Sequence, residues 1–271
     1  MESTASDNIR PVLLISASDS SSAAGMQVDL RVADDLRTPS RCVLTAITVQ
    51  GDAGLDLLFP VPPDSVTMAI TRCLADPPGI AAVKIGLLAD VRTVEATAEA
   101  LTPALEKGVP VVVDPVMRST HGSDLSDDTT AAAFLRTMAP ATTVITPNRQ
   151  ELDRLAALSG QRGAGEIEKV AALVSRGIRA VLVTGGDDAG DKCTDILYPK
   201  GGRASRFQHP RIGGSTPRGT GCALSTALAI HLALGMTLEK AVESSIEYVT
   251  GKIRSSTLVG NQRLLFPGAA R

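Results

Sequence analysis

Residues 109–158 read VPVVVDPVMRSTHGSDLSDDTTAAAFLRTMAPATTVITPNRQELDRLAAL. The stretch holds two short apolar, β-branched runs, at 109–113 and 142–145, and each is followed by a segment of helical periodicity, at 129–138 and 151–158. Strands that alternate with helices are usually parallel, and strands that are apolar throughout are covered on both faces. The stretch therefore predicts an α/β fold around a mostly parallel sheet, with helices on both faces.

The same alternation extends outward in both directions. Further strands are expected at 12–15, 42–49, 81–85 and 180–183, and further helices at 25–36, 91–105 and 167–176. Two late runs, at 194–198 and 204–207, flank a Gly-containing turn at 199–202 and predict a β-hairpin. Two helices, at 221–234 and 238–254, complete the fold.

Length and composition indicate a globular protein with one domain. The chain has 271 residues, is 44% hydrophobic and carries a net charge of −2, with dispersed cations, so no nucleic acid is expected as partner. The first residues lack the pattern of a signal peptide, and no run approaches the roughly 18 apolar residues of a membrane span. We expect no membrane association, a cytoplasmic location, a domain over residues 10–258, and loose tails at 1–9 and 259–271.

Polar residues follow several of the predicted strands. They are Asp19, Gln50, Asp114, Asn148 with Glu151, and Thr184 with Gly186. Parallel sheets bind ligands at the carboxyl ends of their strands. One such residue would mean little, because strand ends usually meet a polar turn. A polar residue after each of five strands predicts a single polar cleft.

The segment 213–235 indicates an anion site. Gly219, Thr220, Gly221 and Cys222 precede a long apolar helical pattern, and the start of a helix offers unpaired N–H groups and a positive dipole end. A cysteine has a pKa of roughly 8.5, and a helix N-terminus lowers it, so we expect Cys222 to have an increased thiolate fraction. The alternatives are a buried helix with a flexible loop, and an inert cysteine.

Two of the strand-end groups suit a metal ion. Mg²⁺ prefers oxygen ligands, which Asp114 and Glu151 offer, directly or through water. The alternative for Asn148 and Glu151 is a helix N-cap with a carboxylate at its third position, and both roles can coexist. The chain has neither the G-x-x-x-x-G-K-[ST] motif nor a G-x-G-x-x-G after its first strand, so a P-loop and a dinucleotide fingerprint are absent.

Taken together, these motifs resemble those of the hydroxymethylpyrimidine/phosphomethylpyrimidine kinases of thiamine biosynthesis, in the ribokinase superfamily. The resemblance covers about residues 11–252. It is carried by DSSSAAGMQVD at 19–29, TAITVQ at 45–50, KIGLL at 84–88, VVDPVM at 112–117, TPN at 146–148 with Glu151, and GTGC at 219–222.

The resemblance implies a ribokinase-like three-layer sandwich and an ATP- and Mg²⁺-dependent kinase that phosphorylates a small pyrimidine. It also implies a homodimer. Catalytic residues would be Gly219, Thr220, Gly221 and Cys222, with Cys222 accepting the hydroxyl proton. Substrate would contact Asp19, Gly25, Asp29, Gln50 and Leu87. The nucleotide would contact Asn148, Thr184, Gly186 and Arg218, and the metal Asp114 and Glu151.

The chain departs from the family pattern at several positions. Ala17, Ser22 and Ala23 stand where glycines are usual, Thr120 and Asp187 replace a lysine and a histidine, and Arg218 stands where a histidine normally precedes GTGC. The usual Gly-rich C-terminal stretch is replaced at 259–265. Two alternatives therefore remain open, a pyridoxal kinase and a regulatory protein that binds the pyrimidine without efficient transfer.

Overall fold

The computed structural model describes residues 10–51, 54–117, 125–186, 190–213 and 217–266. Thr120 and Asp187, two of the departures noted above, and the expected tail at 1–9 lie outside the described residues. A nine-stranded sheet runs through the molecule in the order β3-β2-β1-β4-β5-β6-β7-β8-β9. The six strands from β2 to β7 are parallel, while β3, β8 and β9 are antiparallel to their neighbours.

The four strands β4 to β7 in the middle of the sheet are short and apolar except for Lys84. In chain order, the strands of the whole sheet are β1 (Val12–Asp19), β2 (Ser40–Gly51), β3 (Gly54–Pro60), β4 (Ala82–Ile85), β5 (Val111–Val113), β6 (Val144–Ile145), β7 (Ala180–Val183), β8 (Lys192–Pro199) and β9 (Ser205–Pro210). The predicted hairpin is confirmed as β8 and β9. The predicted parallel core is confirmed as well, because apolar strands occupy the middle of the sheet.

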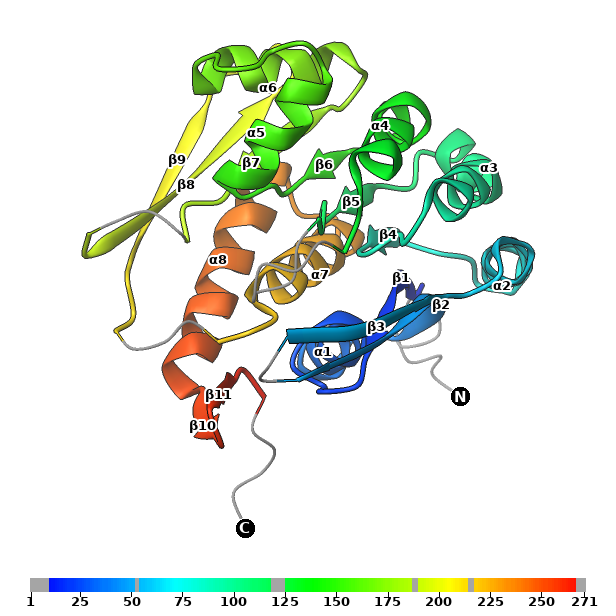
Figure 1. Cartoon of the computed structure of the whole chain (residues 1–271), viewed down its shortest axis with the longest axis horizontal. Helices are drawn as coiled ribbons and strands as arrows, with labels where there is room; N and C mark the ends of the chain where they lie inside the picture. The colour runs from blue at the N-terminus through cyan, green and yellow to red at the C-terminus, as the bar shows by residue number, and fades with distance from the viewer. Residues whose placement is uncertain (1–9, 52–53, 118–124, 187–189, 214–216, 267–271) are drawn as a thin grey trace, which may run out of the picture.

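Helices cover both faces of this sheet (Figure 1). One layer contains α2 (Pro63–Ala75), α3 (Val91–Glu106), α4 (Asp128–Thr137), α5 (Arg149–Leu158) and α6 (Glu166–Ser175). The other contains α1 (Gly25–Asp35), α7 (Thr220–Ala233) and α8 (Leu238–Ser255). Successive residues of β1 face opposite layers, with Leu13 and Ile15 in one core and Val12 and Leu14 in the other. The expected three-layer α/β fold is confirmed.

Helix α7 is the most enclosed helix in the molecule. All nine residues from Ala223 to His231 are buried, because the helix lies between α1, α8 and the sheet. This explains why its sequence is apolar on every side rather than along one stripe. A rigid, central helix fixes the position of the loop that precedes it.

The elements that were not anticipated from the sequence include β3 and α2. β3 and α2 flank the proline cluster at 60–63. Pro60 ends β3, and Pro63 occupies the first turn of α2, where its missing N–H has no cost. The edge strand therefore ends, and the helix begins, at this proline cluster.

The expected loose tail at 259–271 is wrong for its first part. Thr257–Val259 and Gln262–Leu264 form a small antiparallel hairpin, β10 and β11, and Leu265 is buried against the core. Leu264 also forms a backbone bridge with Arg218. Burial of Leu265 and this bridge hold the segment in place, so the domain extends beyond residue 258.

Candidate active site

Three of the five predicted strand ends contribute their polar residues to one cleft, whereas Asp19 and Gln50 do not line it. A cavity of about 240 Å³ lies at the carboxyl ends of the central strands. It is lined by Asp114, Thr146, Asn148, Glu151, Thr184, Gly186, Thr220 and Gly221, by residues of β8 and β9 and the loop after them, and by one side of α8. Four different segments therefore bring seven predicted residues to one site, namely Asp114, Asn148, Glu151, Thr184, Gly186, Thr220 and Gly221.

The start of α7 has the geometry of an anion cradle. Gly219 is its N-cap, with a left-handed φ of 83°, and no side chain caps the first turn. A Cβ at Gly219 would lie 2.4 Å from the carbonyl oxygen of Ala23, so only glycine fits there. The N–H groups of the first turn are left for a ligand, at the positive end of the helix dipole.

The cradle faces a carboxylate across the cleft. A Cβ placed on Gly221 would be 3.5 Å from Oδ2 of Asp114, which shows how closely α7 approaches the end of β5. Burial raises the pKa of Asp114 to about 6, against the opposing effect of the Lys84 ammonium. Asp114 is thus a strongly buried carboxyl beside the first turn of a helix.

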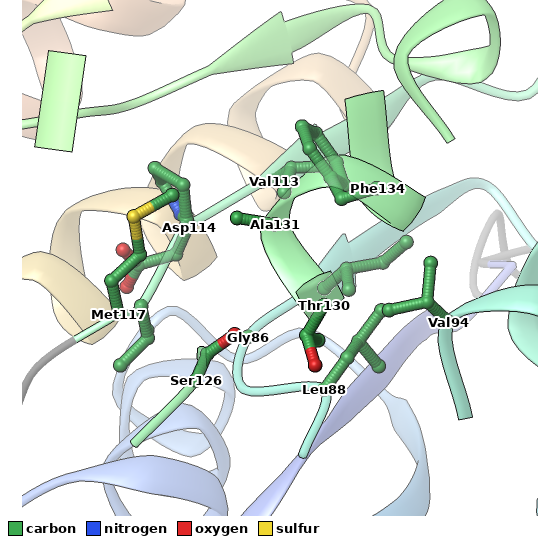
Figure 2. Close-up of a pocket in the computed structure, with 13 residues that line it drawn as sticks. Gly86, Leu88, Val94, Val113, Asp114, Met117, Ser126, Thr130, Ala131 and Phe134 are labelled. Carbon is green, nitrogen blue, oxygen red and sulfur yellow. The ribbon is translucent and has the colours of Figure 1, made fainter. Parts of the chain in front are cut away.

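Asp114 also lines a second, smaller cavity of about 40 Å³ on the other side of the β5 end. Figure 2 shows Asp114 and Met117 on one side of this cavity and Leu88 and Val94 on the other. Gly86, Thr130 and Phe134 complete much of the wall. Asp114 is therefore the polar group at the junction of the two cavities.

Cys222 does not have the acidic thiol that its helix position predicted. Burial raises its pKa to about 12, and the neighbouring carboxylates of Asp114 and Asp29 add to this effect, while Lys84 opposes it. The expected increase in thiolate fraction is therefore wrong. Desolvation next to two carboxylates outweighs the helix dipole, whose effect is worth only about 0.3–2 kcal/mol.

The predicted N-cap at Asn148 is confirmed. The Glu151 N–H donates to Oδ1 of Asn148, and the Asn148 N–H donates to Oε2 of Glu151, both at 2.9 Å. Both residues still line the cleft, so capping leaves room for a ligand role. Within the described residues, no three His, Cys, Asp or Glu side chains form a cluster that could hold a metal by themselves.

The turn at Thr184 and Gly186 is held by groups that the sequence did not reveal. Asp195 accepts the Gly185 N–H at 2.8 Å, and Arg211 donates to the Gly186 carbonyl at 2.8 Å. His209 lies 3.3 Å from Asp195. These three residues come from β8, β9 and the residue after β9, and they line the same cleft. Only the pairing of the two strands places them there, although alternation along β8 could have put Cys193 and Asp195 on one face.

A second polar group lies at the ends of β1 and β2. Arg218 is 6% exposed, and its Nη2 donates to Oε1 of Gln50 at 2.7 Å and to Oδ2 of Asp19 at 3.4 Å. Its Nη1 donates to Oγ of Ser21 at 3.1 Å. The structure thus places Arg218 against two of the predicted substrate residues, whereas the resemblance put it among the nucleotide contacts.

Asp29 is enclosed beneath the site. Its two carboxylate oxygens accept from Nζ of Lys84 at 2.8 and 2.7 Å, and Oδ1 also accepts from Thr226 at 2.8 Å. Both Asp29 and Lys84 have no accessible surface. The residue that the resemblance assigned to substrate contact is therefore sealed inside an ion pair between α1 and β4.

The two remaining predicted residues lie near the first loop. Gly25 has a φ of 61°, and a Cβ there would be 2.5 Å from the Ala17 carbonyl oxygen, so the start of α1 packs directly on β1. Leu87 is buried in a small apolar cluster with Ala17, Ala46 and Leu125, and its carbonyl accepts from Thr45. Alanines at 17 and 23 are accommodated without exposure.

Comparison with known proteins gives consistent matches over nearly the whole chain. Residues 19–265 match the family described as Phosphomethylpyrimidine kinase. The hydroxymethylpyrimidine/phosphomethylpyrimidine kinase of Streptomyces coelicolor is 36% identical over 252 residues, covering 92% of this chain and 90% of that protein. The protein of the same name from Aquifex aeolicus is 32% identical over 251 residues, covering 92% and 96%.

Solved structures agree with the sequence matches. An ADP complex of Bacillus subtilis pyridoxal kinase superposes with a TM-score of 0.82 at 28% identity, covering 95% of this chain and 97% of that one. A phosphomethylpyrimidine kinase from Clostridium difficile gives a TM-score of 0.74 at 28% identity, covering 90% and 99%. The expected ribokinase-like fold is confirmed. Within the described residues, every helix is too short or too polar to cross a membrane.

Proposed function

This chain belongs to the phosphomethylpyrimidine kinase family, and we propose that it transfers the terminal phosphoryl group of ATP to 4-amino-5-hydroxymethyl-2-methylpyrimidine, to its monophosphate, or to both, in thiamine biosynthesis. The observation that carries the proposal is the uncapped first turn of α7 facing the buried Asp114 across a cleft. As a kinase that uses ATP, it would act in the cytoplasm.

The proposed division of labour follows from phosphoryl transfer itself. That reaction needs positioning and stabilisation of charge more than covalent chemistry. The N–H groups of Thr220, Gly221 and Cys222 would hold the oxygens of the transferring group. Asn148, Thr184 and Gly186 line the part of the cleft where ATP would bind. The substrate side would be formed by residues that lie outside the lining of this cavity, namely Asp19, Gly25, Gln50 and Leu87.

Mg²⁺ fits the oxygen donors of this cleft. Asp114 and Glu151 line the same cavity, and two carboxylates with several waters and phosphate oxygens are a common environment for this ion. When bound, Mg²⁺ would neutralise negative charge on the phosphates.

We revise the role of Cys222. A thiol with a pKa of about 12 is protonated near neutral pH, so it does not start the reaction as a proton acceptor. Its hydrogen bond lowers the pKa of Asp114, so the thiol acts as a donor to that carboxylate. We propose that Cys222 orients Asp114 and shapes the cradle, in place of the base that the resemblance implied.

The decisive assay incubates the purified full chain with ATP, Mg²⁺ and each pyrimidine, and follows product by mass spectrometry. Gly219→Ala should reduce kcat/KM by about a hundredfold or more, because its Cβ would collide with Ala23 and distort the cradle. Gly213→Ala is the matched control, because a Cβ there meets nothing within 4 Å. Absence of product with every pyrimidine would remove the proposal.

A pyridoxal kinase is the second candidate, favoured by the similarity to the Bacillus subtilis pyridoxal kinase structure. Comparison of kcat/KM for pyridoxal and for hydroxymethylpyrimidine separates the two activities. A regulatory protein that binds pyrimidine is the third candidate. Tight binding of the pyrimidine in calorimetry, without binding of ATP, would favour it over both kinases.

We further propose that two copies of the chain associate through the outer face of β2 and β3. Ile47 pairs with Phe59 and Val49 with Leu57 across the two strands, and all four side chains are exposed. An apolar cluster on an edge strand and its neighbour is unusual for a surface that faces only water.

A further inference from the structure

Gln50 is held in place by its backbone. Its N–H donates to Oγ of Ser20 at 3.0 Å, and its carbonyl oxygen accepts from the same hydroxyl at 3.2 Å. These two bonds join the end of β2 to the loop after β1. The position of the Gln50 side chain is therefore defined before any ligand binds.

The amide of Gln50 is also fixed in its orientation. Its Oε1 accepts from Nη2 of Arg218, and its Nε2 donates to Oγ1 of Thr48 at 3.1 Å. Arginine can only donate hydrogen bonds. The Thr48 hydroxyl already donates its proton to the Ser18 carbonyl at 3.0 Å, so it can only accept from Gln50. A rotated amide would point its NH₂ group at the guanidinium, so only one orientation is compatible with both neighbours.

Arg218 is itself held from several directions. Its guanidinium is buried and contacts Asp19 and Ser21, and Asp19 Oδ1 is fixed by the N–H and the hydroxyl of Ser21, both at 2.8 Å. Its backbone is paired with Leu264. The Nε of Arg218 has no hydrogen-bond partner among the described residues. Such a buried and tethered cation is a rigid neighbour for Gln50, in contrast to a flexible surface arginine.

We propose that Arg218 determines the substrate specificity of this site by fixing Gln50 to recognise an aminopyrimidine edge. This inference rests on the proposed function. With respect to the described residues, the fixed amide keeps one free N–H on Nε2 and one free lone pair on Oε1. A pyrimidine that carries an exocyclic amine beside a ring nitrogen presents the complementary acceptor and donor, so the two groups pair side by side.

The same reasoning explains why arginine differs from the histidine that is usual at this position. A neutral histidine has one donor and one acceptor nitrogen, and it accommodates either orientation of a neighbouring amide. Arginine permits only one orientation of that amide. Pyridoxal has no amine beside its ring nitrogen, so it cannot satisfy both free groups of the fixed amide, and a site with unpaired polar groups discriminates against such a ligand.

The test is calorimetric binding of hydroxymethylpyrimidine and of pyridoxal to the full chain without ATP. Arg218→Met should weaken hydroxymethylpyrimidine binding by about tenfold and pyridoxal binding by less than about twofold. In a Gln50→Ala background the same substitution should change the Kd of hydroxymethylpyrimidine by less than about twofold. Arg31→Met is the matched control, because Arg31 contacts the same loop at the Ser22 carbonyl but not Gln50.

Arg218→Lys covers the case in which Arg218→Met does not fold. It retains a cation near Asp19 but lacks the fork that reaches Asp19 and Gln50 together, so the same selective loss is expected. Equal weakening of both ligands, or an unchanged effect in the Gln50→Ala background, would overturn the inference. Failure of the proposed function is distinct, because it appears as absent phosphorylation by the unaltered chain, whatever the binding data show.

Discussion

At the residue scale, the thiol of Cys222 illustrates how burial and position compete. The residue lies in the first turn of α7, where the dipole favours a thiolate, yet it is desolvated beside Asp114 and Asp29, which favours the neutral thiol. The buried Lys84 ammonium reduces this effect without cancelling it. The outcome is a thiol that is protonated throughout the neutral range.

We therefore predict slow alkylation of Cys222. With iodoacetamide at pH 8, Cys42 should react first, because its side chain is exposed to solvent. Cys222 should remain largely unmodified on the same timescale, because burial raises the pKa of its thiol. Peptide mass spectrometry of the labelled chain measures both sites in one sample. Labelling of Cys222 at a rate equal to that of Cys42 would show that its thiol is acidic after all.

At the scale of elements, the ion pair between Asp29 and Lys84 connects α1 to β4, and Thr226 adds α7 to the same contact. A buried pair of this kind contributes less net stability than its short distances suggest, because both charges lose their hydration. Removal of one partner is costly, since the other is left buried and unpaired. The pair therefore acts mainly to fix how the three elements meet.

This leads to a prediction for the ion pair. Lys84→Met should lower the free energy of unfolding by about 3–5 kcal/mol, and addition of Asp29→Leu should recover much of that loss. Urea denaturation measures both changes. Lys240→Met, which removes an exposed partner of Glu243 on α8, is the control and should have no measurable effect. Equal stability of Lys84→Met and the unaltered chain would contradict this account.

The start of α4 provides a second test at this scale. Asp127 caps the helix by accepting the Thr130 N–H at 2.8 Å. The Thr129 hydroxyl and this N–H lower the pKa of Asp127 to about 2. A depressed pKa in the folded state means that the charged cap stabilises the protein above the unfolded pKa of about 3.9, and that this contribution is lost as the pH falls through about 2.

Asp127→Ala should therefore lower the free energy of unfolding by about 1 kcal/mol at neutral pH. The difference from the unaltered chain should shrink as the pH falls from about 4 towards 2, in urea denaturation measured across this range. Asp127→Asn supplies the comparison, because an asparagine cap does not titrate here. A destabilisation by Asp127→Ala that stayed constant with pH would argue against capping by the carboxylate.

Much of this architecture follows from local patterns. Apolar runs between periodic segments predicted the parallel strands and most helices, and polar residues after the strands predicted the cleft with Asp114, Asn148 and Thr184. Local patterns did not predict β3, whose only partner is β2, or the hairpin after α8, which is held by contact with Arg218 and the core. The enclosure of Asp29 depends on Lys84, which is 55 residues away in sequence, and no local signal reports such a pairing.

At the scale of the whole molecule, we propose that two copies of the chain meet through the apolar face of β2 and β3. Phe59 is 61% exposed and lies directly across from Ile47 at the edge of the sheet. We predict that the unaltered chain sediments as a dimer and that Phe59→Asp sediments as a monomer. Sedimentation velocity measures both states.

Ile167→Asp is the control for this experiment. Ile167 is also an exposed large apolar residue, but it lies on α6, far along the chain from the proposed face. It should leave the dimer intact. A monomeric unaltered chain, or equal dissociation by both substitutions, would rule out the β2–β3 face as the interface.

The bonds between the two ends of the chain also govern the order in which the molecule is built. Arg218 reaches Ser21 and Asp19 across 197 and 199 residues, and Thr226 reaches Asp29 across 197. A ribosome adds about 5–20 residues each second. The first loop and α1 are therefore synthesised on the order of ten seconds before the residues that bond to them. A nascent chain that lacks its final quarter therefore has the sheet's first strands but neither Arg218 nor helices α7 and α8, so its cleft is not assembled.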